Sequence, residues 1–568
     1  GSQQRHALPT APAAMHEFAR RFGYASGPSF MAEYDERTAA NRGILERFLA
    51  AEGSGHRWLN DLFHPLSDGE TGLARLRQLG FAHAAKARDE FVALYSGAPD
   101  RPHTAHTRQR FAAAAPALIA ALSRCADPDG ALVRLSRILA NLRAPGAVYE
   151  ILHTTPELSE YLVKLVNNSE FLTDILVRDP GLFDTFGSHA ALAQPLSRDV
   201  LEETVTALSA AYEPEAALYR LHAGETLRIG MRELFCDVDV FQIGRELSLL
   251  AEVCLTRVLD KAYRSVAGRH GVADAPFAVI GLGKLGGAEL GYGSDLDLLF
   301  VYDGEADFNL DVSPVEYFTG IASHTIRSLK EPTRYGTLYD IDARLRPDGN
   351  KGVLTVSLAR MEEYYRHEAQ AWERLALAKA RAVGAAPSAA PAQAFAEQVA
   401  RHARDFAFGR PLTPEDIANI EAIRAKIVAS ASPLDLKKGE GGIAEIEFAV
   451  RMLQARCASG SPELKRSDLS GALDILARIR ALDPESARTL LDAYLFLRRI
   501  ENRIRMKHGR HGSCLPESAE EQADLAARLA IPGDLAGLVR DHQARVHAVY
   551  LRTLETCGTP REGASRGN

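Results

Sequence analysis

Apolar residues recur three and four positions apart through most of this chain, which is the spacing of one face of an α-helix. Turns rich in proline and glycine, such as residues 127–130, separate these runs. The clearest helical runs are residues 131–142, 201–212, 244–262 and 487–506. The pattern predicts a mainly α-helical protein.

One region departs from the helical spacing. Residues 277–281 and 298–302 are short runs rich in β-branched and aromatic residues, and residues 338–345 alternate between polar and apolar. A helical segment at about residues 314–328 lies between the second and third runs. We therefore expect an α/β domain of about 120 residues, embedded between helical regions.

Composition excludes several classes of protein. The net charge of −7 argues against a nucleic-acid partner that is bound through a broadly basic surface. The uncharged apolar stretch at residues 111–123 contains Pro116 and is shorter than the roughly 20 residues of a membrane helix. The 6 cysteines include no CxxC pair, which indicates neither a zinc site nor a disulfide framework. We expect a cytoplasmic protein without a membrane partner.

The two ends of the chain resemble each other. Residues 6–9, 17–22 and 44–49 recur as residues 513–516, 524–529 and 549–554. Chance similarity between helices rich in Ala, Arg and Leu is one interpretation, and duplication is the other. If the similarity comes from duplication, residues 5–50 are the tail of an upstream copy of the same unit.

The residues most typical of catalysis lie at the start of the second β run. Asp295 and Asp297 are two positions apart, so on a strand their side chains point to the same face. Two carboxylates this close repel each other unless a cation lies between them. The pair therefore predicts a site for a divalent ion that has oxygen ligands and also binds phosphate.

A glycine-rich segment precedes this pair. Gly286 and Gly287 can let backbone N–H groups approach an anion, because no side chain blocks the approach. Gly281, Gly283 and Gly286 also have the spacing of a dinucleotide-binding fingerprint. That fold needs an acidic residue about 20 positions later on a second strand of a βαβ unit, whereas here the aspartates follow on the very next strand.

A third carboxylate comes from the alternating stretch. One of its faces would carry Asp340, Asp342, Arg344 and Arg346. A solvated strand edge is one interpretation of this face. In the other, Asp342 completes a metal-binding triad while Arg344 and Arg346 neutralise a polyphosphate. Three carboxylates suit two metal ions in an in-line nucleotidyl transfer.

Four motifs together resemble a known family. They are GLGKLGGAELGYGSDLDLLF (281–300), DIDARLRPDGNKG (340–352), AWERLALAKAR (371–381) and DLKKGEGGIAEIEF (435–448). The four motifs and their order resemble those of the bifunctional glutamine synthetase adenylyltransferase/adenylyl-removing enzymes. The first motif by itself resembles the signature of DNA polymerase β-type nucleotidyltransferases. The resemblance covers about residues 105–555. It implies a polymerase β-like mixed sheet in a nucleotidyltransferase domain, flanked by helical domains.

The family has two homologous halves, and this chain resembles the one that adds AMP to glutamine synthetase. The resemblance implies transfer of AMP from ATP to a tyrosine, with two Mg²⁺ ions, and the PII signalling protein as a further partner. Phosphorolytic removal of AMP and a non-catalytic module that senses nucleotide or PII are the alternatives.

The resemblance also assigns residues. Asp295, Asp297 and Asp342 would be catalytic and bind the metal ions. Contacts to nucleotide or phosphate would come from Gly286, Gly287, Ser294, Arg344, Arg346 and Lys437. A glycine turn that merely starts a helix is the other interpretation of the segment around Lys437, and the role of Asp340 is left open.

Four further charged residues receive weaker assignments. Lys379 and Arg381 could line the cleft, on a helix that runs to residue 381. Lys284 and Glu289 flank the glycine-rich segment and are expected to form surface ion pairs. The expected domains are residues 1–100 (helical tail of an upstream half and linker), 101–265 (helical), 266–385 (nucleotidyltransferase), 386–556 (helical bundle) and 557–568 (flexible tail).

Overall fold

Helices account for most of the computed structural model, as the apolar spacing predicts. The structure describes residues 8–9, 11–50, 57–63, 69–186, 192–306, 308, 310–508 and 512–558. Unit 1 takes in Gly1–Ser123 and Gly146–Thr154, and unit 2 takes in Arg124–Pro145 and Thr155–Asn568. The expected domain boundaries remain predictions.

The described residues of unit 1 form helices and one short pair of strands. Its elements are α1 (Pro12–Arg21), α2 (Gly27–Ala50), α3 (Arg57–Phe63), α4 (Glu70–Gln78), α5 (Ala84–Ser96), β1 (Gly97–Ala98), β2 (Arg101–Pro102), α6 (Ala105–Leu122) and, from residue 146 on, α8 (Pro145–Thr154). Thr104 caps α6, since its side chain accepts a hydrogen bond from the N–H of Thr107 (3.2 Å).

The helices that precede the sheet in unit 2 begin where the sequence supplies capping residues. They are α7 (Pro128–Ala140), α9 (Pro156–Asn168), α10 (Glu170–Arg178), η1 (Pro180–Phe186), α12 (Arg198–Ala211), α13 (Pro214–Phe235) and α14 (Val240–His270). Asp127, Ser169, Ser197 and Asp239 each accept a backbone N–H at a helix start. The three helices expected in this region are confirmed as α7, α12 and α14.

A five-stranded mixed sheet follows these helices. Its strands are β3 (Phe277–Gly281), β4 (Leu296–Tyr302), β5 (Ile341–Asp342), β6 (Thr355–Ser357) and β7 (Arg381–Ala386). Strand β3 pairs antiparallel with β4 and β7, whereas β4 pairs parallel with β5 and β6. The embedded α/β region is therefore confirmed.

The expected strand at residues 338–345 is wrong in extent, because only Ile341–Asp342 pairs with a neighbour. The N–H of Arg344 donates to Oδ1 of Asp342 (2.9 Å), a local turn that competes with strand pairing. The helix expected through residue 381 is also wrong. It ends as α18 (Ala371–Ala376) and η3 (Leu377–Lys379), after which β7 begins at Arg381.

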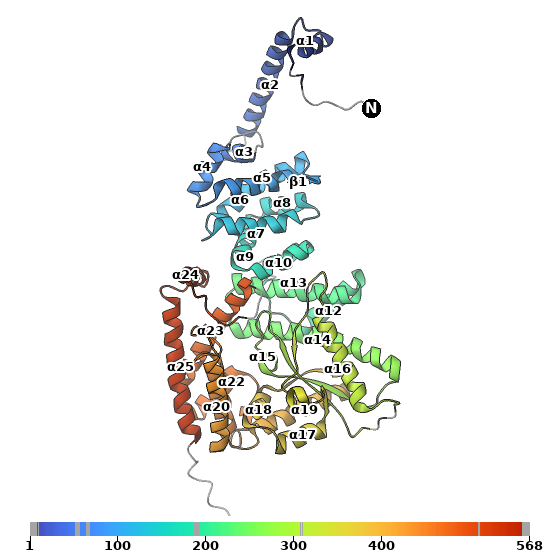
Figure 1. The fold of residues 1–568 in the computed structure, drawn as a ribbon, viewed down its shortest axis with the longest axis vertical. Helices are drawn as coiled ribbons and strands as arrows, with labels where there is room; N and C mark the ends of the chain where they lie inside the picture. Colours follow the sequence, from blue (N-terminus) through green and yellow to red (C-terminus); the bar gives the residue numbers. More distant parts are fainter. Residues whose placement is uncertain are drawn as a thin grey trace, which may run out of the picture. The chain divides into compact units, whose positions relative to one another are not determined.

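Helices cover both faces of the sheet (Figure 1). On one side lie α14 and α16 (Pro314–Lys330), where Phe318 stacks on Phe277 of β3 with ring centroids 5.3 Å apart. On the other lie α17 (Leu358–His367), α18 and α19 (Ala390–Phe408). Helix α16 confirms the helix expected at about residues 314–328.

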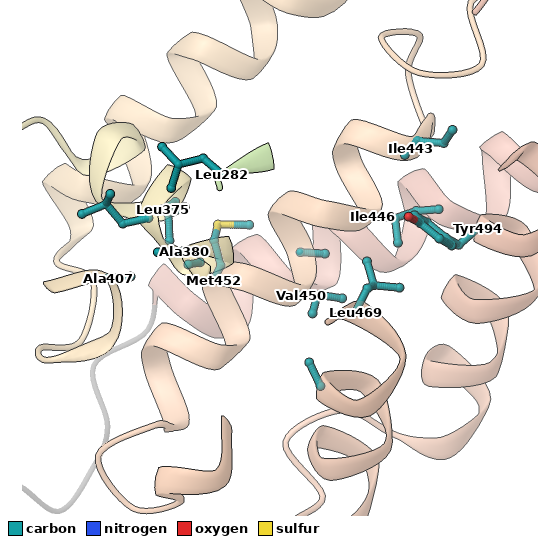
Figure 2. Close-up of a cluster of buried hydrophobic side chains, with 14 of the residues drawn as sticks. Leu282, Leu375, Ala380, Ala407, Ile443, Ile446, Val450, Met452, Leu469 and Tyr494 are labelled. Carbon is teal, nitrogen blue, oxygen red and sulfur yellow. The ribbon is translucent and has the colours of Figure 1, made fainter. Parts of the chain in front are cut away.

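The helices after the sheet share a core with it. They are α20 (Pro414–Ala429), α21 (Ile443–Cys457), η4 (Pro462–Leu464), α22 (Leu469–Arg478), α23 (Pro484–His508), α24 (Ala519–Arg528) and α25 (Leu535–Gly558). One cluster of buried apolar side chains runs from Ile280 of β3 through Val450 of α21 to Tyr550 of α25. Figure 2 shows its middle, where Leu282 and Met452 lie near Ala380. Sheet and later helices are thus packed as one body.

The similarity between the chain ends extends to their helices. Helices α1 and α24 both have 10 residues, and α2 and α25 both have 24. The helix lengths thus agree with a duplication. Of the first repeated segment, residues 6 and 7 lie outside the described residues. The origin of residues 5–50 in an upstream copy remains a prediction.

No helix in the described part of the chain combines the length and the apolar character needed to cross a bilayer.

Candidate active site

The three aspartates meet where two parallel strands begin. Asp297 of β4 lies directly opposite Asp342 of β5 in the register, and Asp295 immediately precedes β4. The N–H of Leu296 donates to the carbonyl of Asp340 (2.9 Å), which fixes this register. Residues that are paired across parallel strands present their side chains to the same face. Local pairing thus brings together carboxylates that are 45 residues apart in the chain.

The environment of Asp297 shows how close these charges are. Burial, together with the neighbouring carboxylates of Asp295 and Asp342, raises the pKa of Asp297 to about 6. Lys437 and Lys379 oppose this rise but do not cancel it. A carboxylate in this position gains most from a bound cation, because the cation offsets both burial and like-charge repulsion.

Asp342 is held by Arg344 while it faces Asp297 across the strand pair. Nε of Arg344 lies 2.9 Å from each carboxylate oxygen, and this contact keeps the pKa of Asp342 below its usual value. The Asp342 side chain is 14% exposed, whereas that of Arg344 is 70% exposed and has room to move. In this arrangement, no three described His, Cys, Asp or Glu side chains form a metal-ligand group. A metal ion held by all three acids would compete with Arg344 for the Asp342 carboxylate.

Arg346 and Asp340 have their direct partners outside the acid group, although the nearby charge of Arg346 also lowers the pKa of Asp342. The Arg346 guanidinium donates to the carbonyls of Gly352 (3.1 Å) and Val353 (3.0 Å), so it pins the loop that follows β5. Asp340 is exposed and forms an ion pair with Lys330 (3.4 Å). The expected common face of two acids and two arginines is therefore only partly formed.

The glycine-rich segment forms the short helix α15 (Gly283–Gly286) beside the acids. A Cβ atom on Gly283 would lie 2.0 Å from Oδ2 of Asp297, so a larger residue there would displace this carboxylate. The N–H of Gly286 donates to Leu282 (2.8 Å) and that of Gly287 to Gly283 (3.2 Å). Both N–H groups are thus used within the segment, and contact of these two glycines with phosphate remains a prediction.

Ser294 closes the turn that leads into the acid pair. Its Oγ accepts hydrogen bonds from the N–H of Gly291 (3.3 Å) and from Arg505 (2.9 Å). The side chain is buried. In this structure Ser294 therefore fixes the backbone just before Asp295.

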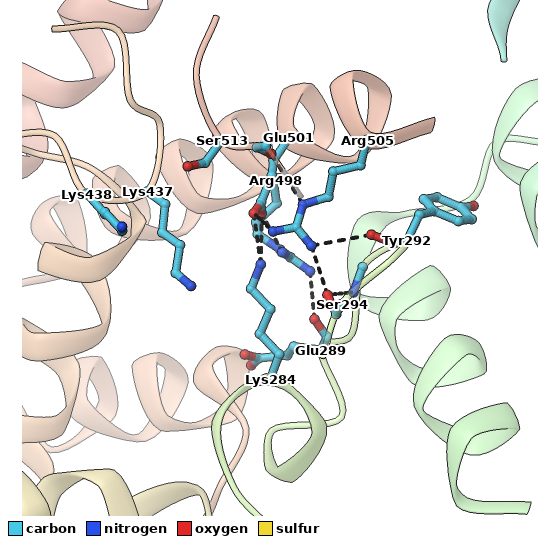
Figure 3. A network of polar contacts seen from close by, with 12 residues as sticks. Lys284, Glu289, Tyr292, Ser294, Lys437, Lys438, Arg498, Glu501, Arg505 and Ser513 are labelled. Atoms are coloured by element: carbon cyan, nitrogen blue, oxygen red, sulfur yellow. Dashed lines mark hydrogen bonds and ion pairs between the residues drawn. The ribbon is translucent and has the colours of Figure 1, made fainter. Parts of the chain in front are cut away.

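Lys437 lies in the turn between α20 and α21. Asp435 shapes this turn, because its Oδ1 accepts the N–H groups of Lys437 (2.8 Å) and Lys438 (2.9 Å). The Lys437 side chain extends toward Lys284, as Figure 3 shows. Its charge acts on Asp297 from an element 140 residues away in sequence. Lys437 is thus a half-buried cation near the acids.

Lys284 and Glu289 do form ion pairs, but a surface location is wrong for them, because Glu289 is buried and Lys284 is half-buried in a charged network. Nζ of Lys284 lies 2.9 Å from Glu501 of α23. Glu289 accepts from Lys379 (3.0 Å) and from the hydroxyl of Tyr494 (3.1 Å). The glycine-rich segment therefore faces the later helices rather than solvent.

Lys379 and Arg381 also lie in this interior. Lys379 is 6% exposed and contacts Glu447 as well as Glu289. Arg381 donates to the carbonyl of Leu285 (2.7 Å) and forms an ion pair with Glu252 (2.6 Å). Arg381 thus supports α15, and Lys379 holds Glu289 just beyond it while its charge acts on Asp297. That they line the cleft remains a prediction.

Sequence reasoning missed Arg498, Glu501 and Arg505 of α23. The carboxylate of Glu501 is fully buried and contacts Lys284, Arg498 (2.6 Å) and Arg505 (2.8 Å). Spacings of three and four place these residues on one helical face, which is the available sequence signal. An exposed ladder of ion pairs has the same spacing, so the pattern alone does not reveal burial.

Two family models match the chain. Residues 159–398 match the model described as glutamate-ammonia ligase adenylyltransferase. Residues 421–553 match the model described as GlnD PII-uridylyltransferase. The first match contains the three aspartates, and the second contains Lys437 and the α23 residues.

Curated relatives agree with the first match. The bifunctional glutamine synthetase adenylyltransferase/adenylyl-removing enzyme of Xanthobacter autotrophicus is 30% identical over 97% of this chain and 57% of its own length. The enzyme of the same name from Methylococcus capsulatus is 31% identical over 97% of this chain and 58% of its own length. That from Stenotrophomonas maltophilia is 34% identical over 77% of this chain and 45% of its own length. The chain spans about half the length of these relatives.

Proposed function

Because the chain belongs to the family of bifunctional glutamine synthetase adenylyltransferase/adenylyl-removing enzymes, we propose that it transfers AMP from ATP to a tyrosine of glutamine synthetase. One observation carries the proposal: Asp295, Asp297 and Asp342 meet at the start of two parallel strands, where burial and repulsion raise the pKa of Asp297 to about 6. The mixed sheet that holds them would be a polymerase β-like nucleotidyltransferase fold.

The donor set fits magnesium. Carboxylate oxygens are the ligands that Mg²⁺ takes from proteins, together with water and substrate phosphates. Asp295 and Asp297 would hold the ions, and Asp342 would join once Arg344 turns from it toward the polyphosphate. When bound, Mg²⁺ lowers the pKa of an attacking hydroxyl and offsets charge on the leaving pyrophosphate.

Lys437 is the best placed residue for a direct phosphate contact. It is a cation close to Asp297, and its backbone is fixed by Asp435. Ser294, Gly286 and Gly287 would act mainly by shaping the backbone around the nucleotide, because their polar groups already have partners in the chain. Arg346 would hold the loop after β5.

The reaction would be a direct displacement. The tyrosyl oxygen, having lost its proton, forms a bond to the α-phosphorus while the bond to pyrophosphate breaks on the opposite side. Here the residues mainly hold the reactants in line and stabilise the spread negative charge. Lys437 and Arg344 supply positive charge for this purpose.

The helices after the sheet would also bind regulatory proteins. Residues 421–553 are similar to a model whose description names PII, which supports the PII signalling protein as a partner. Glutamine synthetase would be the protein substrate, because the names of the relatives specify it.

The test is transfer of label from α-³²P-ATP to unmodified glutamine synthetase, in the presence of Mg²⁺. We expect wild type to label the protein and Asp297→Asn to lose about 100-fold or more of the rate, since a charge-stabilising metal ligand is removed. Asp303→Asn is the matched control, because Asp303 follows the far end of β4 and its carboxylate accepts a local N–H from Glu305 (3.0 Å).

The same assay distinguishes the reverse chemistry. A second arm supplies AMP-modified glutamine synthetase with phosphate and follows the release of ADP. Release of ADP without any labelling in the first arm would reverse the proposed direction. Full activity of Asp297→Asn would contradict the assignment of the site itself.

A further inference from the structure

One face of α23 lies against the whole segment that leads to the acid pair. Tyr494, Arg498, Glu501 and Arg505 are spaced by four, three and four residues, which places them in one row along the helix. The side chains of Arg498, Glu501 and Arg505 are 1%, 0% and 8% exposed, respectively. We call these three charged residues the α23 brace (Figure 3).

Each residue of the α23 brace contacts the segment of residues 284–294. Arg498 donates to the carbonyl of Glu289 (2.6 Å). Arg505 donates to Oγ of Ser294 (2.9 Å) and to the carbonyl of Tyr292 (3.3 Å). Glu501 accepts from Lys284 of α15 (2.9 Å). Buried charged contacts thus fix both the turn before Asp295 and the helix beside Asp297.

The contacts of Arg505 bear most directly on the aspartates. Ser294 precedes Asp295 in the chain, and its Oγ also accepts the N–H of Gly291. Loss of the guanidinium would leave the Tyr292 carbonyl without this donor and would leave the Ser294 side chain with the weaker contact to Gly291. Positions in this turn set the direction of Asp295 and, through β4, of Asp297.

We propose that Arg505 is a positioning residue for the transfer reaction: it fixes the turn of residues 291–294 so that Asp295 and Asp297 point into one metal site. The inference rests on the proposed function and adds to it a residue from the later helices. The chemistry of the acid pair then depends on a helix about 200 residues away in sequence.

The charge balance around Glu501 makes Arg505 open to substitution. Glu501 contacts three cations, so Arg505→Met leaves its carboxylate paired with Lys284 and Arg498. The cost of a buried, unpaired charge is therefore avoided. We expect Arg505→Met to fold, and Arg505→Lys, which keeps the charge, is the milder second variant.

Binding of Mn²⁺ without nucleotide, measured by titration calorimetry, is the primary readout. We expect Arg505→Met to weaken Mn²⁺ binding by about 10- to 100-fold, the usual effect of removing a partner that orients metal ligands. The kcat for transfer should fall by a similar factor, because a displacement of about 1 Å at the ligands costs that much. The KM for ATP should change by less than about threefold, and Arg505→Lys should restore part of the Mn²⁺ affinity.

Arg499→Gln is the matched control. Arg499 is the exposed neighbour of Arg498, and its guanidinium donates to the carbonyl of Leu529 (2.9 Å) rather than to the glycine-rich segment. Arg499→Gln removes an arginine contact of the same helix. An effect that came from lost stability alone would therefore appear in both Arg499→Gln and Arg505→Met. We expect Arg499→Gln to leave Mn²⁺ affinity and kcat as in wild type.

A double-mutant cycle tests the contact itself. Ser294→Ala and Arg505→Met should be non-additive in Mn²⁺ affinity, because each breaks the same hydrogen bond, whereas Ser294→Ala and Arg499→Gln should be additive. If Arg505→Met binds Mn²⁺ and turns over like Arg499→Gln, the positioning role is wrong while the proposed function stands. If wild type neither labels glutamine synthetase nor binds Mn²⁺ through Asp297, both are wrong.

Discussion

Gly283 illustrates at the scale of one residue how closely the backbone approaches the acids. Its φ is +51°, and an added Cβ atom would lie 2.0 Å from Oδ2 of Asp297. Gly293 has a similar φ of +59°, yet a Cβ atom there would meet no atom within 4 Å. The two glycines therefore carry similar backbone strain when replaced, and only one of them crowds the acid pair.

This difference gives a prediction. Gly283→Ala should displace the Asp297 carboxylate and lower the transfer rate by about 10-fold or more. Both Gly283→Ala and Gly293→Ala should lose about 1–2 kcal/mol of stability from a positive φ. Steady-state transfer assays and urea unfolding of both variants check this. Equal activity of the two variants would show that contact with Asp297 does not matter.

The limits of sequence reasoning are visible at the arginines. Alternation correctly placed Asp342 beside Asp297, because strand register depends on local pattern. The same alternation put Arg344 and Arg346 on that face, yet one holds Asp342 and the other holds loop carbonyls. Where a long side chain ends depends on acceptors that the fold brings near, and local spacing does not encode these.

The same contrast appears at the scale of elements. Strands β3 and β4 could be predicted, because their runs of β-branched and aromatic residues are buried on both faces. Strand β7 could not: its sequence, RAVGAA, is mostly small residues and follows a helix without a break signal. Alanine favours helix by propensity, and tertiary pairing with β3 overrides that preference here.

Helix α23 gives the later helices a predictable sensitivity to acid. Burial alone would raise the pKa of Glu501, but Lys284, Arg498 and Arg505 outweigh it and hold this pKa well below its ordinary value of 4.5. A carboxyl group with a lowered pKa in the folded state stabilises the fold above its unfolded-state pKa. That contribution is lost as the pH falls toward the folded-state pKa.

We therefore expect the free energy of unfolding of wild type to decrease as the pH drops below 4.5, and to decrease less steeply in Glu501→Gln. The variant should also be less stable at pH 7, by about 3–5 kcal/mol, because three buried cations lose their partner. Urea unfolding between pH 7 and pH 3.5 measures both effects, with the exposed Glu485→Gln of the same helix as control. If the free energy of unfolding fell equally steeply with pH in wild type, Glu501→Gln and Glu485→Gln, this account of Glu501 would be wrong.

At the scale of the whole molecule, unit 2 combines what the sequence presents as separate parts. The α/β region and the helical bundle were expected as distinct domains, because their periodicities differ. In the structure the two regions share one apolar core, from Ile280 to Tyr550, and a buried polar network between the glycine-rich segment and α23. Such long-range contacts have no local sequence signature.

A shared core predicts shared unfolding. The chain has two tryptophans, Trp58 in α3 of unit 1 and the half-buried Trp372 in α18 of unit 2. In Trp58→Phe, fluorescence therefore reports only on Trp372, close to the sheet. We expect its urea transition to coincide with the loss of hydrogen-exchange protection in α21, α23 and α25, since coincident probes indicate one cooperative step.

The alternative outcome has an equally clear signature. If α23 and α25 lost protection at lower urea than the Trp372 transition, the later helices would be a separate folding unit, and the acid pair would keep its geometry without them. MgATP distinguishes the cases further, because a ligand that binds only the folded state stabilises every element that unfolds with its site. We expect MgATP to shift both probes equally in Trp58→Phe and neither probe once Asp297→Asn is added.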